Sequence, residues 1–362
     1  MKKKRNVIIL VVTFVLGIVA ALLVLLLNHR STLDDFAVKN PETITRIFMA
    51  NNRGHRVLLT HDLENTSDSA WMVDEKYYAS QPMIEMLVNT MASMRIREKI
   101  NRAALPNVVK DLSANNVKVE VYQMVYRIDW FKGKLKLFPH EKKTVTYYVG
   151  HETRDMMGSY ILRDGDKEPY VIYMPGLRGM INTRFIADPI PWRSHRIMKL
   201  DVKNIERVEL DIAAAPDQSY SVVREGEGFY FECGEPRMRA ESFDTARVAQ
   251  MLSSFTNLNF DEYAMAVPKV EIDSVFSKAP KTVLTVTDRA GNRREVKTYV
   301  KYTNPDDLKA MPDTAMYQVF DINRLYAIID SKDTVLIQYF VFDNILQPAS
   351  FFLGNERYHV AL

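Results

Sequence analysis

The sequence predicts an α+β protein: an N-terminal transmembrane helix followed by a duplicated module of antiparallel sheet with helices packed on one face. Three observations support this fold class. An uninterrupted apolar run fills residues 7–27, patterns typical of strands and helices follow it, and their order recurs about 160 residues later. The 362 residues are enough for two hydrophobic cores.

The apolar run of residues 7–27 predicts a membrane anchor. At about 1.5 Å per residue, a helix of this length crosses the roughly 30 Å hydrocarbon core of a bilayer. Four cationic residues precede it within residues 1–6, which places this end in the cytoplasm by the positive-inside rule. We therefore expect a single-pass protein of the cytoplasmic (inner) membrane, with a linker at residues 28–40 and the bulk of the chain in the periplasm.

A cleaved signal peptide is the alternative for this segment. The apolar region of a signal peptide is usually about 7–15 residues long and ends at a small-residue cleavage site. Here the run ends on Leu25-Leu26-Leu27 and is followed by Asn28-His29-Arg30, which offers no such site. The sequence favours a signal-anchor that stays on the protein.

The charge and cysteine content bear on two features, nucleic-acid binding and internal disulfides. The net charge is +3, and removing the five cations of residues 1–30 leaves the exported part at −2. This balance gives no electrostatic reason to expect a nucleic-acid partner. Cys233 is the single cysteine, so the chain forms no internal disulfide, and we expect Cys233 to be a small buried apolar residue.

The two modules are predicted from matching orders of apolar patterns. The first module, residues 41–198, has expected strands at 44–49, 56–61 and 71–73, helices at 84–94 and 108–112, and strands at 117–122 and 144–149. The second module, residues 199–330, repeats this order with strands at 205–210, 220–223 and 228–231, a helix at 248–258, and strands at 282–287 and 295–300. A C-terminal apolar segment at residues 331–362 is too short to span a membrane and is expected to pack in a core.

One hairpin is longer in the first module than in the second. The extra stretch lies near residues 126–138 and mixes aromatic residues with lysines; its candidate partner-binding residues are Trp130, Phe131, Lys132, Lys134 and Lys136. Such a mixture suits a lipid headgroup surface or an acidic partner. A solvated hairpin whose lysines guard an edge strand explains the same pattern.

The segment that bridges the modules supplies two further candidates, Trp192 and Arg193. Tryptophan and arginine are the residue types that dominate binding hot spots. The structural alternative is that Trp192 packs between the modules while the arginines pair with carboxylates. Both interpretations stay open at the level of sequence.

No local motif indicates catalysis. The histidines do not complete an H-E-x-x-H zinc site, and the chain has no G-x-S-x-G elbow and no phosphate-binding glycine loop. Ser194 and His195 are neighbours, so in a strand they would point to opposite faces and make a poor nucleophile–base pair. We expect no enzyme activity, no metal site and no cofactor.

Several short motifs together resemble a family of Gram-negative envelope proteins that carry domain of unknown function 4340. They are Ile44-Thr45-Arg46-Ile47-Phe48, Trp71-Met72-Val73, Tyr147-Tyr148-Val149-Gly150, Gly158-Ser159-Tyr160, Pro169-Tyr170-Val171, Pro175-Gly176, Arg184-Phe185 and Trp192-Arg193-Ser194. Some members of the family neighbour auxiliary subunits of gliding-motility ABC transporters. The resemblance implies a membrane-tethered periplasmic protein and carries no catalytic residue onto this chain.

Taken together, these patterns predict a membrane-anchored periplasmic binding or scaffolding protein. The resemblance suggests an accessory of an envelope or ABC-transporter-linked complex. Residues 7–27 would anchor the protein in the inner membrane, and the exported part would bind a protein partner in that complex. The alternative is a periplasmic domain that binds lipid or glycan, which requires a concave apolar pocket between the modules. An unrecognised hydrolase comes last and requires clustered carboxylates with shifted pKa values.

Overall fold

The computed structural model describes residues 13–19, 36–65, 67, 70–130, 135–303 and 320–354. Residues 13–19 are helical, and the rest of the expected anchor at residues 7–27 lies outside the described part of the chain. No helix among the described residues is long and apolar enough to cross a membrane. The chain divides into two compact units between Ser194 and His195, close to the boundary at 198 that the sequence predicts.

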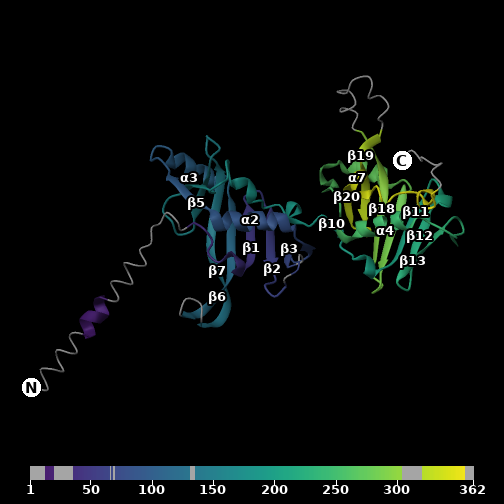
Figure 1. The fold of residues 1–362 in the computed structure, drawn as a ribbon. Helices are drawn as coiled ribbons and strands as arrows, with labels where there is room; N and C mark the ends of the chain where they lie inside the picture. The colour runs from purple at the N-terminus through teal and green to yellow at the C-terminus, as the bar shows by residue number, and fades with distance from the viewer. Residues whose placement is uncertain are drawn as a thin grey trace, which may run out of the picture. The chain divides into compact units, whose positions relative to one another are not determined.

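The first unit is built on one antiparallel sheet (Figure 1). Its described strands follow the order β4-β3-β2-β1-β6-β7-β8-β9-β5. Every neighbouring pair runs antiparallel. The strands are β1 (Ile44–Asn51), β2 (Arg56–His61), β3 (Trp71–Val73), β4 (Tyr77–Tyr78), β5 (Arg95–Lys99), β6 (Val117–Trp130), β7 (Leu135–Glu152), β8 (Ser159–Arg163) and β9 (Tyr170–Tyr173).

The second unit has its own antiparallel sheet, with described strands in the order β14-β13-β12-β11-β17-β18-β19-β20-β16. They are β11 (Ile205–Ile212), β12 (Tyr220–Glu225), β13 (Gly228–Cys233), β14 (Met238–Arg239), β16 (Glu262–Tyr263), β17 (Thr282–Asp288), β18 (Arg293–Tyr302), β19 (Phe320–Ile329) and β20 (Asp333–Gln338). A short pair, β10 (Arg196–Met198) with β15 (Leu258–Asn259), lies beside this sheet in the same unit.

The described strands have the same spatial order in the two sheets. If the nine strands of each sheet are numbered 1 to 9 along the chain, both sheets have the order 4-3-2-1-6-7-8-9-5. The pairing irregularities also coincide. The register shifts between Ile44 and Arg46 where β1 pairs with β6. It shifts between Ile205 and Arg207 where β11 pairs with β17. The expected mixed α+β class with large antiparallel sheets is therefore confirmed.

Helices α2 (Gln81–Ser93) and α4 (Thr245–Ser253) cover the larger core of their units. Both present a buried apolar stripe at helical spacing, which packs on alternate residues of the sheet. In the first unit the helical residues are Ile84, Leu87 and Met91, and in the second they are Val248, Met251 and Leu252. Asp244 caps α4 by accepting hydrogen bonds from the backbone N–H groups of Ala246 and Arg247.

The expectation that helices pack on one face only is wrong, because α3 (Leu105–Ala114) and α5 (Lys269–Phe276) cover the opposite faces. Successive strand residues point to opposite faces. In β7, Val149 faces the core with α2, whereas a Cβ on the next residue, Gly150, would lie 3.1 Å from Leu112 of α3. In the second unit, Val275 of α5 packs with Tyr326, while its neighbour Leu325 faces the core with α4.

The C-terminal segment completes the second unit. Strand β20 joins its sheet, and helices α7 (Tyr339–Phe342) and α8 (Ala349–Phe352) follow. Ile337, Phe342 and Phe352 are fully buried in the larger core of this unit. Residues 355–362 lie outside the described part of the chain.

Candidate functional site

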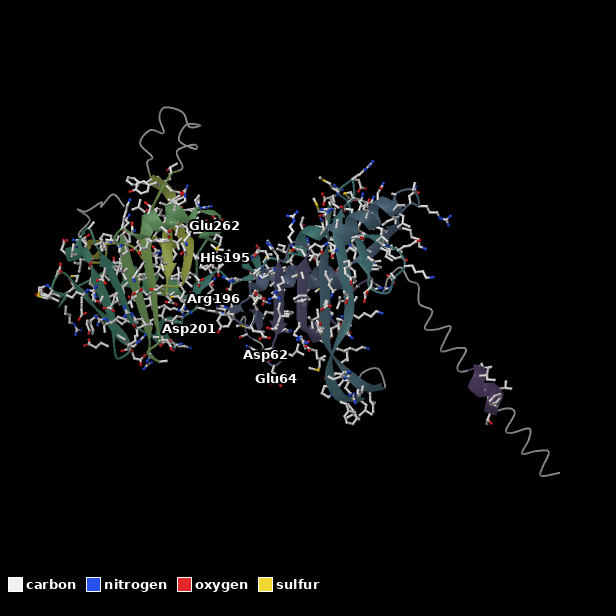
Figure 2. The ribbon with its side chains drawn as sticks, turned by 180° about the vertical axis from the view of Figure 1, so that it is seen from behind. Asp62, Glu64, His195, Arg196, Asp201 and Glu262 are labelled. Atoms are coloured by element: carbon white, nitrogen blue, oxygen red, sulfur yellow. The ribbon has the colours of Figure 1, made fainter. Side chains whose placement is uncertain are left out.

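A two-stranded arm projects from the sheet of the first unit. Strand β1 pairs with β6 only as far as Gln123, and β8 pairs with β7 only from Tyr147 onward. Between these limits the backbone of residues 124–130 pairs only with that of residues 135–141, as far as the chain is described, and the last two residues of the segment 135–143, Lys142 and Lys143, pair with Gln123 and Tyr122. We call these two segments the β6–β7 arm. Figure 2 shows the arm extending away from the body of its unit.

Three apolar side chains are exposed on the described part of the arm. Leu135 is 38% exposed, Leu137 is 41% exposed and Phe138 is 63% exposed. Ile128 pairs with Leu137 across the hairpin, and cross-strand partners share one face. Phe138 has a positive φ of 59°, an uncommon conformation for a bulky residue. The arm therefore presents apolar surface that the described residues of its hairpin leave exposed.

The root of the arm is fixed to the sheet by charged groups. Arg46 on β1 pairs with both carboxylate oxygens of Glu141 on the arm. Thr45 Oγ1 donates a 2.6 Å hydrogen bond to the same carboxylate. The Arg46 guanidinium also lies 4.5 Å from the centre of the Tyr122 ring. A guanidinium held in this bidentate geometry resists rotation, so the arm leaves the sheet in a defined direction.

Glu120 forms a second attachment at the arm's root. Its carboxylate lies 2.8 Å from Lys118 Nζ and 3.2 Å from Lys143 Nζ, and it accepts a 2.9 Å hydrogen bond from the Tyr122 hydroxyl. Hydrogen bonding to Lys118, followed by Tyr122 and Lys143, lowers the pKa of Glu120 to about 2. The charge of Lys143 is therefore compensated by Glu120 within the first unit.

Three other cations of the arm are not used in ion pairs within the described part of the unit. Arg127, Lys136 and Lys142 are exposed, and none forms an ion pair with a described residue. Lys136 Nζ lies 5.3 Å from the centre of the Tyr126 ring. Exposed apolar side chains on β7, bordered by these cations, would suit an acidic surface that also has apolar patches.

The structure locates the predicted arm residues only in part. Trp130 ends β6, and its backbone pairs with that of Leu135. Lys136 lies on β7, opposite Asp129. The remaining candidates, Phe131, Lys132 and Lys134, lie outside the described residues. Sequence reasoning found the arm because aromatic and basic residues interrupt an otherwise repeated pattern.

Trp192 is a core residue, which corrects its assignment to a partner surface. Its side chain is 0% exposed within the first unit, and its indole N–H donates a 2.8 Å hydrogen bond to the Ile186 carbonyl. A side chain without exposed surface offers nothing to a partner. Arg193 lies 3.6 Å above the Tyr77 ring, and its backbone bridges to Ala79. Hot spots and cores use the same residue types, so sequence alone does not separate the two roles.

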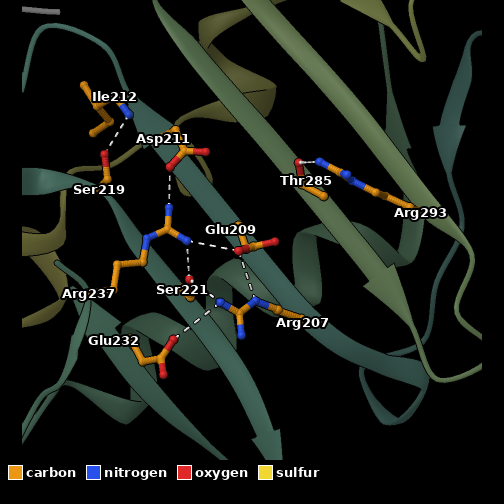
Figure 3. Close-up of polar contacts among 10 residues, drawn as sticks. All are labelled: Arg207, Glu209, Asp211, Ile212, Ser219, Ser221, Glu232, Arg237, Thr285 and Arg293. Carbon is orange, nitrogen blue, oxygen red and sulfur yellow. Dashed lines mark hydrogen bonds and ion pairs between the residues drawn. The ribbon is translucent and has the colours of Figure 1, made fainter. Parts of the chain in front are cut away.

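The sheet of the second unit carries a charge network on its polar face (Figure 3). Arg207 Nε and Arg237 Nη1 both lie 3.0 Å from Oε1 of Glu209. Arg237 also donates to Ser221 Oγ at 2.5 Å and pairs with Asp211. Each charge in this network has a partner of the opposite sign. We therefore assign it to strand cohesion.

No cluster of three or more histidine, cysteine, aspartate or glutamate side chains among the described residues could hold a metal ion. His151 and Asp111 form a pair at 2.8 Å, but both side chains are exposed to solvent. The pKa of a catalytic base is usually shifted by burial, which this pair lacks. His195, labelled in Figure 2, stacks on Phe260 with ring centres 4.8 Å apart.

The fold and the arm define a class: an α+β protein of two antiparallel sheets, one of which carries a projecting hairpin. The family model described as a domain of unknown function (DUF4340) matches residues 71–280. The match covers more than half of the chain, so the protein belongs to this family, and the resemblance noted in the sequence is confirmed. It runs from β3 through the arm and into the second unit. No curated protein and no solved structure matches the chain.

Proposed function

We propose that the protein is a membrane-anchored periplasmic binding or scaffolding protein whose β6–β7 arm contacts a protein partner. The observation that carries this proposal is the exposed apolar surface of the arm, next to cations that lack a partner among the described residues. Residues 7–27 act as the tether in the inner membrane. A tether and a contact element together are what a scaffold requires.

A duplication of one ancestral module is part of the proposal. Two observations support it: the common strand order of the described sheets and the register shift at the same place in each. In a duplicated protein, one copy is free to keep the structural role while the other gains a contact. The difference between the copies is then where function is found.

The hairpin that corresponds to the arm in the second unit is short. Strands β17 and β18 end in a tight turn in which Asp288 Oδ1 accepts hydrogen bonds from the N–H groups of Ala290, at 2.9 Å, and Asn292, at 2.8 Å. Gly291 supplies the positive φ of 84° that the turn requires. A sheet of this order is therefore complete without an arm, which favours a binding role for the extra residues.

The partner we propose is an acidic subunit of an envelope complex, such as one linked to an ABC transporter. The positive balance of the arm supports an acidic partner, and the apolar run of residues 7–27 after four cationic residues supports the envelope.

Co-purification of the full chain in mild detergent tests the proposal. The arm variant Leu137→Ser/Phe138→Ser should lose at least about thirtyfold in partner recovery, as expected for truncation of a hot spot. Met238→Ser is the matched control, because Met238 is an apolar side chain that is 69% exposed in the second unit. Thermal melts must first show that both variants are folded.

Two results would contradict the proposal. The wild-type chain could yield no stoichiometric partner, or the folded arm variant could retain the partner as well as the Met238→Ser control does. Either result would assign the arm to a role within the chain.

A further inference from the structure

The second unit contains a cavity of about 410 Å³ between α5 and β18. Val275 of α5 and Tyr299 and Val300 of β18 form part of its wall, with Ala214 from the loop after β11. Val275 is 8% exposed and Tyr299 is 7% exposed, so the wall is anchored in a packed cluster. The volume falls within the roughly 300–1,000 Å³ of small-ligand sites.

A lysine without a carboxylate partner lines this cavity. The half-buried Lys281 ammonium forms no hydrogen bond or ion pair with a described residue. Its Nζ lies 5.8 Å from the centre of the Tyr339 ring. By contrast, the comparably enclosed Lys301 in the same sheet pairs with Asp321 at 2.8 Å. Burial lowers the pKa of Lys281, which marks the ammonium as incompletely solvated.

The rim of the cavity adds a second cation and an aromatic surface. Lys278, which also lines the cavity, lies with Nζ 5.1 Å from the centre of the Tyr302 ring. Tyr302 in turn meets Phe320 with ring centres 5.3 Å apart, and both side chains are about half exposed. Apolar surface therefore continues outward from the cavity next to its cations.

We propose that this cavity binds a fatty acid, with Lys281 pairing with the carboxylate and the acyl chain lying against Val275, Ala279 and Tyr299. The chemistry of the wall favours this ligand class. One compact anion compensates the ammonium, and a chain of methylenes replaces water on the apolar wall, each buried methylene contributing about 0.8 kcal/mol. A neutral lipid would leave the ammonium uncompensated. The inference is independent of the arm and its partner.

Photolabelling of the full chain in lipid nanodiscs tests the site. A dodecanoic acid that carries a diazirine is irradiated with the protein, and the labelled peptides are mapped by mass spectrometry. Labels should fall on residues 272–282 or 296–302. Excess dodecanoate should suppress the labelling, whereas the same concentration of the uncharged dodecanol should suppress it at least about tenfold less, because dodecanol lacks the charge-assisted contact.

Two variants of the site and one control complete the experiment. Lys281→Met keeps the length of the side chain and removes the charge, and it should reduce labelling at least about tenfold. Ala214→Trp should fill the cavity from an exposed position, and it should abolish labelling even if Lys281→Met does not fold. Lys203→Met, at an exposed ion-paired lysine of the same unit, should leave labelling unchanged.

Three results would overturn the proposal, one concerning the site and two concerning the ligand. Labels confined to other segments would overturn the site. Equal competition by dodecanoate and dodecanol, or unchanged labelling in folded Ala214→Trp, would overturn the fatty-acid assignment.

Discussion

At the scale of single residues, Glu120 shows how the first unit uses charge to fix the arm. Its carboxylate is largely buried and receives contacts from Lys118, Tyr122 and Lys143. These contacts hold the ionised form, so the folded state binds a proton at Glu120 less readily than the unfolded chain does. The folded pKa is about 2, against an ordinary value of 4.5.

This pKa shift predicts a specific pH dependence. The stabilisation is fully present above pH 4.5 and is lost as the pH falls toward about 2, because there the unfolded chain binds the proton first. Glu120→Gln should therefore lower the unfolding free energy of the first unit at pH 7 by about 1–2 kcal/mol, and the difference should vanish near pH 2.

Tryptophan fluorescence measures this effect. All three tryptophans, Trp71, Trp130 and Trp192, belong to the first unit, so denaturant titrations followed by fluorescence report that unit separately. The exposed Glu42 supplies the control variant Glu42→Gln, which should have little effect at either pH. A Glu120→Gln variant as stable as the wild type at pH 7 would contradict the assignment.

At the scale of elements, the sequence predicts strands better than it predicts which helix covers which face of a sheet or where a cavity forms. Alternation and turn residues identify five of the described strands in each sheet, and the broken repeat identifies the arm, whereas strands such as β5 and β16 were missed. The faces covered by α3 and α5 were missed, because the apolar stripe of a helix does not say which side of a sheet it meets. The cavity beside Lys281 was also missed, since its wall comes from segments that are distant in sequence and share no local motif.

The arm should be removable without unfolding the sheet that carries it. Residues 124–143 are replaced by the turn Asp288–Asn292 of the second unit, which closes the corresponding hairpin there. Because the arm's backbone pairs with itself, its removal forfeits the Glu141 and Lys143 contacts, each worth about 0–1 kcal/mol.

Circular dichroism and thermal melts measure the outcome. The shortened chain should keep its strand signal, lose at most a few degrees in Tm, and no longer recover the partner in mild detergent. The unaltered chain is the reference. Loss of cooperative unfolding in the shortened chain would mean that the arm is part of the folding unit.

At the scale of the whole molecule, we expect one topology in the membrane. The cationic residues before position 7 should keep the N-terminus in the cytoplasm, and the units that follow should reach the periplasm. A reporter active only in the periplasm, fused after Leu362, should therefore be active. The protein should also stay in the membrane fraction after a carbonate wash, and release of a shortened soluble form would contradict an uncleaved anchor.

The self-paired backbone of the β6–β7 arm has a consequence for handling the protein. Each strand of the arm keeps one outer edge of N–H and C=O groups that no described strand occupies. Two such edges from separate molecules can pair to extend a sheet, which is how ordered aggregates begin. Like charges at Arg127, Lys136 and Lys142 oppose that approach, and salt weakens their repulsion beyond about 10 Å at 0.1 M. Partner-free preparations should therefore stay monodisperse in dilute buffer and associate as ionic strength rises.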